Sequence, residues 1–163
     1  TARRARGFDV RLLAHDPYIT LTPEERAQYG VELVGRERLL HEADVVVCHV
    51  PLTAETRHMV NREFLALMKR SAYLVNVSRG DVVDQEALVE ALRTRRIAGA
   101  GLDVFSPEPL PPGHPLTTLD NVVLTPHIAA GTLDAFRAKM QFAMANIRRF
   151  AHGEPPLERV PGT

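Results

Sequence analysis

The chain has 163 residues, of which 45% are hydrophobic and 25% are charged, and its 20 basic residues balance its 20 acidic residues. This length and composition are typical of one globular domain, or of one domain with an appendage, that buries a core. The zero net charge favours neither nucleic acid nor an anionic membrane surface as a partner. No apolar run reaches the roughly 18 residues of a membrane-spanning helix, and no signal peptide is visible.

The first residues and the single cysteine bear on the setting of the chain. "TARRARG" predicts the last turn of a helix, because its arginines suit a helix C-terminus and Gly7 ends it. A helix tail without its body predicts that the polypeptide begins earlier. Cys48 excludes an internal disulfide, so we expect a cytoplasmic protein. Its apolar run, "DVVVCHV", predicts a buried side chain rather than a nucleophile.

Short apolar runs alternate with helical patterns along the chain. The predicted strands are Val10–Ala14, Val45–His49, Tyr73–Val77, Gly101–Phe105 and Val122–Leu124. The predicted helices are Arg36–His41, Arg62–Met68 with Asn61 as cap, Gln85–Thr94 with Asp84 as cap, and a long last helix between Thr132 and Gly153. The proline-rich "SPEPLPPGHPL" predicts an extended loop. This alternation predicts the α/β class, with a Rossmann-like doubly wound parallel sheet that is truncated at its N-terminus.

Polar residues follow the predicted strands, where open parallel sheets bind ligands. In chain order, the strands are followed by Asp16, by Val50 and Pro51, by Arg79, by Glu108 and by His127. A histidine exchanges protons at about pH 7, a carboxylate orients it, and an arginine binds a carboxylate with two hydrogen bonds. These three groups suit proton transfer coupled to hydride transfer on a 2-oxo or 2-hydroxy acid, with the hydride supplied by a nicotinamide.

An acid at the end of the second strand of a dinucleotide fold binds the adenosine ribose and favours NAD over NADP, which is the role we predict for Asp16. Taken alone, each residue has a simpler interpretation. Asp16 suits a turn, Arg79 a surface ion pair and Glu108 an exposed loop. His127 is one of seven histidines and, alone, is more typical of a structural role. His49 also ends a strand, and we interpret it as support for the loop that follows.

Four motifs then follow one another in register: "HVPLTAETRHMVN", "YLVNVSRGDVVDQEAL", "GAGLDVFSPEP" and "VVLTPHIAAGT". With them, essentially the whole chain resembles the D-isomer-specific 2-hydroxyacid dehydrogenases. That resemblance implies an NAD-binding Rossmann-like domain, a separate flavodoxin-like substrate domain and a homodimer. It implies that residues 1–131 form an incomplete NAD-binding domain and that residues 132–163 form a C-terminal helix and tail returning toward the substrate domain. The N-terminal part and the glycine-rich loop of the family are missing from this sequence.

The resemblance also implies roles for individual residues. Arg79 in "N-x-x-R-G" binds the substrate carboxylate, Glu108 partners the histidine, and His127 is the general acid and base. Asp16 binds the ribose, and the residues lining the cofactor are Val50, Pro51, Val77 and Asp103. Ala129 belongs to the small residues that leave room for a nicotinamide ring beside His127.

The functional hypothesis is hydride transfer between NAD(H) and a small 2-hydroxy or 2-oxo acid, of the glyoxylate/hydroxypyruvate reductase or D-lactate and D-3-phosphoglycerate dehydrogenase kind. Three alternatives stay open at this point. The chain could be an inactive NAD-binding or dimerising fragment, a dinucleotide-sensing binding protein of the corepressor kind, or a phosphite or formate dehydrogenase of the same superfamily. The sequence does not distinguish which acid is used.

Overall fold

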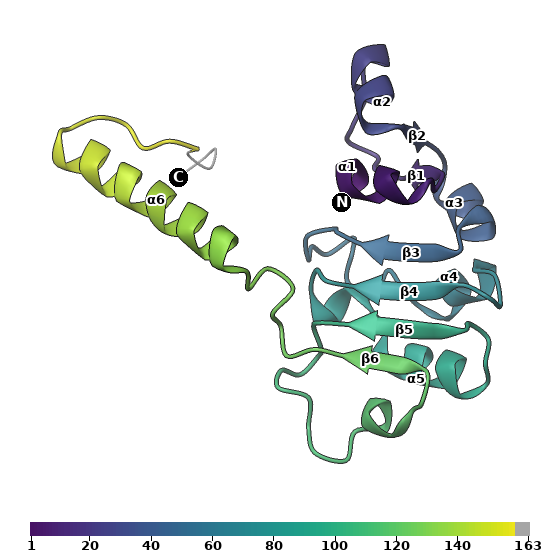
Figure 1. Cartoon of the computed structure of the whole chain (residues 1–163). Helices are drawn as coiled ribbons and strands as arrows, with labels where there is room; N and C mark the ends of the chain where they lie inside the picture. Colours follow the sequence, from purple (N-terminus) through teal and green to yellow (C-terminus); the bar gives the residue numbers. More distant parts are fainter. Residues whose placement is uncertain (159–163) are drawn as a thin grey trace. The chain divides into compact units, whose positions relative to one another are not determined.

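A computed structural model describes residues 1–158 of the chain and divides it into two compact units, Thr1–Pro126 and the segment that starts at His127. The first unit is built on four parallel strands in the order β3-β4-β5-β6 (Figure 1). Their bounds are β3 Val45–Cys48, β4 Tyr73–Asn76, β5 Gly99–Leu102 and β6 Val122–Leu124. The pairing aligns Cys48, Asn76, Leu102 and Leu124, so the four strands end side by side.

Three helices cover one face of this sheet: α3 (Arg36–Glu42), α4 (Arg62–Leu67) and α5 (Gln85–Arg93). The predicted caps are confirmed, because the side chains of Asn61 and Asp84 accept hydrogen bonds from the first turns of α4 and α5. The apolar stripe of α5 is buried and packs with alternate residues of the strands. The stripe consists of Ala87, Leu88, Ala91 and Leu92.

The other face of the sheet is more exposed than continuous apolar strands lead one to expect. Its large apolar side chains keep between about a third and two thirds of their surface: Val45 55%, Val47 38%, Tyr73 52% and Val123 68%. The prediction of parallel α/β layers is therefore confirmed, whereas coverage by helices is complete on only one face among the described residues of this unit.

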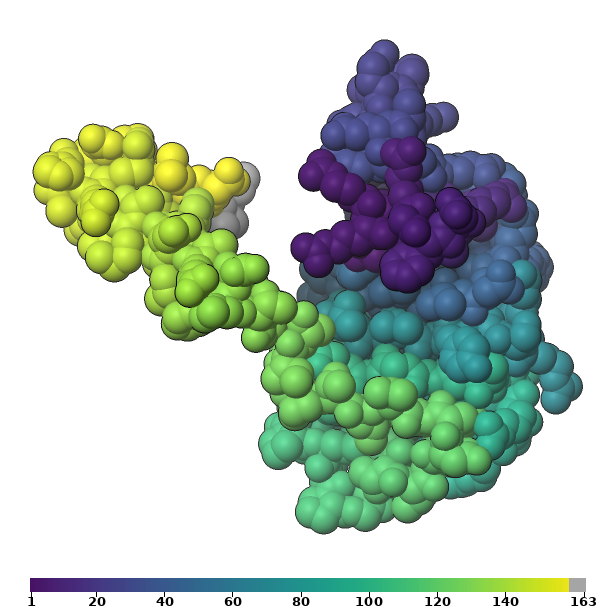
Figure 2. Space-filling view, in the orientation of Figure 1, coloured from purple at the N-terminus to yellow at the C-terminus, as the bar shows by residue number. Residues whose placement is uncertain are grey.

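A second, two-stranded parallel sheet lies near the N-terminus and was not fully predicted. It pairs β1 (Leu12–Ala14) with β2 (Val31–Leu33), joined through α2 (Pro23–Tyr29). The predicted N-terminal helical turn is α1 (Ala2–Ala5), followed by the 3₁₀ turn η1 (Arg6–Phe8). Figure 2 shows this N-terminal portion, in purple and blue, gathered at one end of the first unit.

Most predicted strands and helices differ from the observed ones by one to three residues at an end, and two differences from the predictions stand out. Residues 101–105 were expected to form the fourth predicted strand, but β5 begins at Gly99 because its register is set by pairing with β4 on one side and β6 on the other. The proline-rich loop was expected to be extended throughout, but it ends in the 3₁₀ turn η3 (Pro115–Thr118), which His114 caps by accepting the Leu116 N–H. A further 3₁₀ turn, η2 (Gly80–Val82), follows β4.

The second unit is dominated by one helix, α6 (Leu133–Ala151), which Thr132 caps as predicted. None of its residues is buried, and one set of large apolar side chains stays between 44% and 82% exposed. The set comprises Leu133, Phe136, Met140, Phe142, Met144, Ile147 and Phe150. Among the described residues, no helix has the length and apolar character that a bilayer crossing needs.

Candidate active site

The aligned carboxyl ends of β3, β4 and β5 form one edge of the main sheet, and three loops leave from it. The loop after β3 carries Val50 and Pro51, the loop after β4 carries Val77 and Arg79, and the loop after β5 begins at Asp103. The parallel pairing therefore brings residues that are far apart in the sequence to a common edge, which is where ligands bind in this architecture.

The turn that carries Arg79 is held from beneath by Asn76, the last residue of β4. Asn76 is 1% exposed, and its side-chain amide donates to the Arg79 carbonyl at 2.9 Å. Its Oδ1 accepts the backbone N–H and the hydroxyl of Ser78, at 3.1 and 2.8 Å. Arg79 itself is exposed, and its guanidinium donates to the Ser78 carbonyl at 2.7 Å. The backbone of this turn is thus fixed, and it carries the exposed Arg79.

The loop after β5 places one buried and one exposed acid. Asp103 is 4% exposed; its N–H donates to the Asn76 carbonyl at 3.0 Å, and its Oδ1 accepts the Thr125 hydroxyl at 2.6 Å. A buried carboxylate is costly unless it is hydrogen bonded, so these contacts explain how Asp103 is accommodated. Glu108 is exposed, and its Oε1 accepts the Phe105 N–H at 2.9 Å.

His127 is the first residue of the second unit, three positions after the end of β6. Its backbone φ is +55°, in the left-handed region that residues other than glycine rarely adopt. Such conformations concentrate at functional sites, where the surrounding structure holds them. The His127 and Ala129 residues are both exposed.

Asp16 lies after β1, on the smaller sheet. Its Oδ1 accepts the Tyr18 N–H at 2.9 Å, which closes a tight turn. The Tyr18 hydroxyl donates to Glu55 at 2.8 Å, and this bond raises the pKa of Tyr18 above its ordinary value. The contact ties the Asp16 turn to the loop that begins with Val50 and Pro51. Within that loop, the Thr56 hydroxyl donates to the Pro51 carbonyl at 2.6 Å.

Cys48 and His49, which also lie at the end of β3, make contacts typical of structural residues. Cys48 is 4% exposed, and burial raises the pKa of its thiol to about 11, so it stays a protonated core residue as predicted. His49 has its Nε2 2.9 Å from the Thr1 hydroxyl, and partial burial holds its pKa below the ordinary value.

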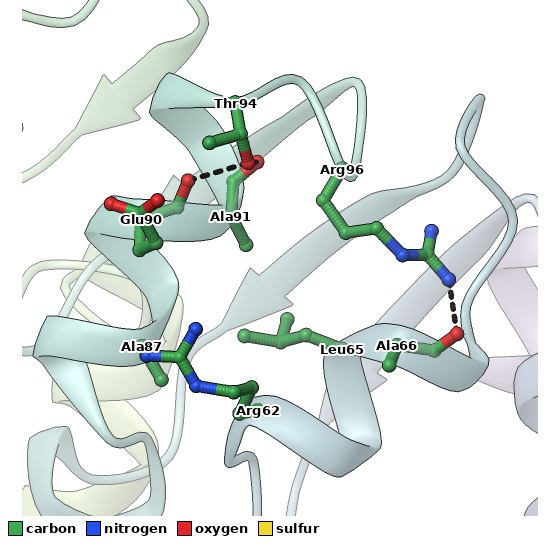
Figure 3. Close-up of a pocket in the computed structure, with 8 residues that line it drawn as sticks. All are labelled: Arg62, Leu65, Ala66, Ala87, Glu90, Ala91, Thr94 and Arg96. Atoms are coloured by element: carbon green, nitrogen blue, oxygen red, sulfur yellow. Dashed lines mark hydrogen bonds between the residues drawn. The ribbon is translucent and has the colours of Figure 1, made fainter.

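A groove between α4 and α5 lies apart from the predicted residues (Figure 3). It has a volume of about 240 Å³ and is lined by Arg62, Leu65, Ala66, Ala87, Glu90, Ala91, Thr94 and Arg96. Arg96 donates a hydrogen bond to the Ala66 carbonyl, and Thr94 donates one to the Glu90 carbonyl. Two of the polar side chains that line the groove are therefore bonded to backbone carbonyls. Among residues 1–158, no group of three or more His, Cys, Asp or Glu side chains could hold a metal ion.

Several side chains that organise this edge were not singled out from the sequence: Asn76, Ser78, Thr125, Glu55 and Gln85. Asn76 stands in the "N-x-x-R-G" motif, so its position carried a signal. Thr125 bonds to Asp103 and Gln85 bonds to Ser106, and each pair is more than 20 positions apart in the chain. No local sequence pattern marks such contacts.

The predicted cofactor residues, on the smaller sheet and at the carboxyl edge of the main sheet, have the chemistry to hold NAD. Asp16, after β1 on the smaller sheet, offers an exposed carboxylate, a group that can accept hydrogen bonds from ribose hydroxyls and would repel a 2′-phosphate. Val50, Pro51 and Val77 offer apolar side chains and backbone groups at the ends of parallel strands. The parallel sheet, with polar residues at its carboxyl edge, defines the class of dinucleotide-binding α/β domains.

Comparison with known proteins identifies the family. The family model described as "D-isomer specific 2-hydroxyacid dehydrogenase, NAD binding domain" matches residues 1–129. The chain therefore belongs to the D-isomer-specific 2-hydroxyacid dehydrogenases, and NAD is the cofactor of the domain it matches. A glyoxylate reductase of Thermofilum pendens is 47% identical over 161 residues, covering 96% of this chain and 46% of the relative.

Solved structures agree with this assignment. The holo form of D-mandelate dehydrogenase from Rhodotorula graminis superimposes with a TM-score of 0.91 at 33% identity, over 99% of this chain and 47% of that one. An NAD-complexed D-isomer-specific 2-hydroxyacid dehydrogenase from Lactobacillus delbrueckii superimposes with a TM-score of 0.87 at 32% identity, over 98% and 51%. The chain thus spans about half the length of the relatives it matches.

Proposed function

We propose that this chain is the NAD-binding part of an oxidoreductase that interconverts small 2-hydroxy and 2-oxo acids. The observation that carries the proposal is the placement of Arg79 and Glu108 on loops that leave the carboxyl ends of adjacent parallel strands, with His127 following the next strand along the sheet. Arginine, carboxylate and imidazole are the groups that this chemistry requires, and they occur here on the segments that follow three neighbouring strands.

Each side chain has a defined task in the reductive direction. Arg79 binds the substrate carboxylate with two parallel hydrogen bonds and so orients the adjacent carbonyl. When bound, NADH supplies the hydride to the carbonyl carbon. His127 donates a proton to the carbonyl oxygen as negative charge develops on it, and takes the proton back in the oxidative direction. Glu108 stabilises the charged imidazole and fixes its orientation.

The cofactor is held by the remaining predicted residues. The Asp16 carboxylate accepts hydrogen bonds from the adenosine ribose, and Val50, Pro51 and Val77 line the cofactor. Asp103 supports the nicotinamide end, and Ala129 leaves space for the ring next to His127. Residues 1–131 form the cofactor domain. Residues 132–163, of which 159–163 lie outside the described part of the chain, return toward the substrate domain.

The reaction is tested by following NADH oxidation with glyoxylate, hydroxypyruvate and pyruvate, on the polypeptide in which this chain occurs naturally and on the chain alone. Turnover of at least one of these acids is expected. His127→Asn is expected to lower kcat by about 100-fold or more, because the proton donor is lost. His41→Asn, an exposed histidine of α3, is the matched control and should retain activity.

Two results would contradict the proposal. One is the absence of turnover on all three 2-oxo acids by the naturally occurring polypeptide. The other is a His127→Asn variant with the activity of the unaltered protein. NADH binding without turnover would instead support a binding protein of the sensing kind.

The assembly and location proposed with this function are a homodimer in the cytoplasm. The exposed apolar side chains of α6 support the dimer, because such side chains are typical of a contact surface with another protein. The free, buried Cys48 suits a reducing compartment. Sedimentation at several protein concentrations tests the dimer, and a monomer at all of them would rule it out.

A further inference from the structure

Glu108 is exposed and lies in the proline-rich loop between β5 and η3. A carboxylate that orients an imidazole must be kept within a fraction of an ångström of its working position. One of its contacts, the hydrogen bond that its Oε1 accepts from the Phe105 N–H, is local, since it joins residues three positions apart. Contacts between this loop and a more rigid part of the fold would keep the carboxylate in place.

Gln85 provides such contacts. Its Oε1 accepts the Ser106 N–H at 3.1 Å, and its Nε2 donates to the Ser106 carbonyl at 3.1 Å. One primary amide thus satisfies both backbone groups of a residue two positions before Glu108, as a neighbouring strand would. The same Nε2 lies 3.1 Å from Nε2 of His114, so the far end of the proline-rich loop contacts this amide as well.

The frame that carries Gln85 is rigid. Gln85 is the first residue of α5, next to the Asp84 cap, whose side chain accepts the Ala87 N–H at 3.0 Å. The buried stripe of α5 then fixes the helix against the sheet. A side chain at this position moves with the core and not with the surface loop.

The turn that carries Arg79 touches the same point of the loop. A Cβ atom placed on Gly80 would lie 1.8 Å from the Phe105 carbonyl oxygen, so the two backbones are in direct contact. A hydrogen bond from Ser106 is the largest cause of the lowered pKa of Asp81. The loop is therefore gripped at Phe105 and Ser106 by residues 80, 81 and 85, all of which follow Arg79 within one segment.

We propose that Gln85 is a positioning residue that holds Glu108 at a fixed place relative to Arg79, by pairing its side-chain amide with both backbone groups of Ser106. The roles of Glu108 and Arg79 rest on the function proposed above. The amide both accepts and donates in this arrangement. A carboxylate keeps the acceptor and loses the donor, and a thioether has no donor and only a weak acceptor.

Hydrogen exchange in the unliganded chain tests the positioning without any turnover. The reporters are the Ser106 N–H, bonded to Gln85, and the Phe105 N–H, bonded to Glu108. In Gln85→Met, both amides are expected to exchange about 10-fold faster or more, because a hydrogen-bonded pair is lost. Gln85→Glu should protect Ser106 partly. Glu86→Met places the same side chain at the next, exposed position and should change neither amide.

Kinetics of the enzyme distinguishes positioning from a general loss of stability. Well below its unfolding temperature, Gln85→Met is expected to lower kcat by about 10-fold to 100-fold through misplacement of Glu108. The dissociation constant of NADH should not change, and Gln85→Glu should recover part of kcat. An unchanged Phe105 exchange rate, or an unchanged kcat with faster exchange, would overturn the proposal. An unaltered protein that turns over no 2-oxo acid refutes the proposed function alone, since the exchange rates still decide the role of Gln85.

Discussion

At the scale of single residues, the carboxyl edge of the main sheet depends on a glycine as well as on charged side chains. Gly80 is the clearest case, because the Phe105 carbonyl occupies the place of its Cβ at 1.8 Å. Any side chain there would push apart the turn after β4 and the loop after β5. The glycine in the "R-G" pair is therefore required by close packing between two backbones.

Gly80→Ala is expected to destabilise the chain by roughly 1–3 kcal/mol, because the backbone must shift to remove the overlap. Gly101→Ala is the matched control, since a Cβ there would meet only the Val75 side chain, at 3.8 Å. That variant should be as stable as the original chain or more stable, by about 0.4–1 kcal/mol. Urea unfolding of both variants measures the difference, and equal stabilities would refute the close approach at Gly80.

The sequence predicted the burial of a single residue better than contacts between distant residues. The burial of Cys48 followed from the apolar run around it, and the structure confirms it. The Asp103–Thr125 and Gln85–Ser106 hydrogen bonds could not be predicted, because each depends on how two distant loops meet. The catalytic and cofactor roles of the predicted residues remain predictions for the assays described above.

At the scale of elements, the helices were predictable because their caps are local. Asn61, Asp84 and Thr132 each accept an N–H from the first helical turn, as their positions indicated. The α2 helix was missed although it has a complete capping box between Thr22 and Glu25, with Pro23 at its first position. Its sequence carries that signal, but none of its residues is buried, so it shows no apolar stripe.

Ionic contacts between elements give a pH dependence. Asp81 forms an ion pair with Arg57 from the loop after β3, and the hydrogen bond from Ser106, followed by that from Arg57, lowers its pKa from the ordinary value of 3.8. A carboxyl group whose pKa is lowered by folding stabilises the folded state at pH values above 3.8. That stabilisation is lost as the pH falls through the folded-state pKa.

Asp81→Asn should therefore lower stability near neutral pH, and the difference from the unaltered chain should shrink in acid. Unfolding by urea near neutral pH and about one unit below the ordinary value of 3.8 measures both differences. Asp134→Asn is the control, because that side chain is 96% exposed and its nearest arginine nitrogen lies 3.9 Å away. A difference for Asp81→Asn that does not depend on pH would contradict this assignment.

At the scale of the whole molecule, buried side chains are distributed unevenly. None of the first 39 residues is buried, and the core begins at Leu40. The small sheet β1–β2 is instead joined to α3 by a closed set of exposed ion pairs at 2.7–2.8 Å. Its members are Arg11, Glu32, Arg38 and Glu42. Exposed ion pairs contribute little to stability, so this sheet lacks the apolar support of the main sheet.

The amides of β1 and β2 are therefore expected to exchange hydrogen faster than those of β3–β6, and NADH is expected to slow them. Exchange measured by mass spectrometry with and without NADH tests both statements. Asp16→Ala serves as the control, since it should remove the effect of NADH on β1. Equal protection of the two sheets in the unliganded chain would show that the exposed ion pairs are sufficient to hold β1–β2.

This unequal support has a consequence for how tightly the cofactor is held. Part of the free energy of NADH binding is then used to order β1–β2. The measured dissociation constant equals that of the ordered state divided by the fraction of unliganded molecules in which β1–β2 is already ordered. Substitutions that add apolar contacts beneath β1 would then tighten NADH binding without touching the cofactor. The affinity for NADH could then be changed by residues that do not contact it. The loops that carry Arg79 and Glu108 would stay anchored to the main core.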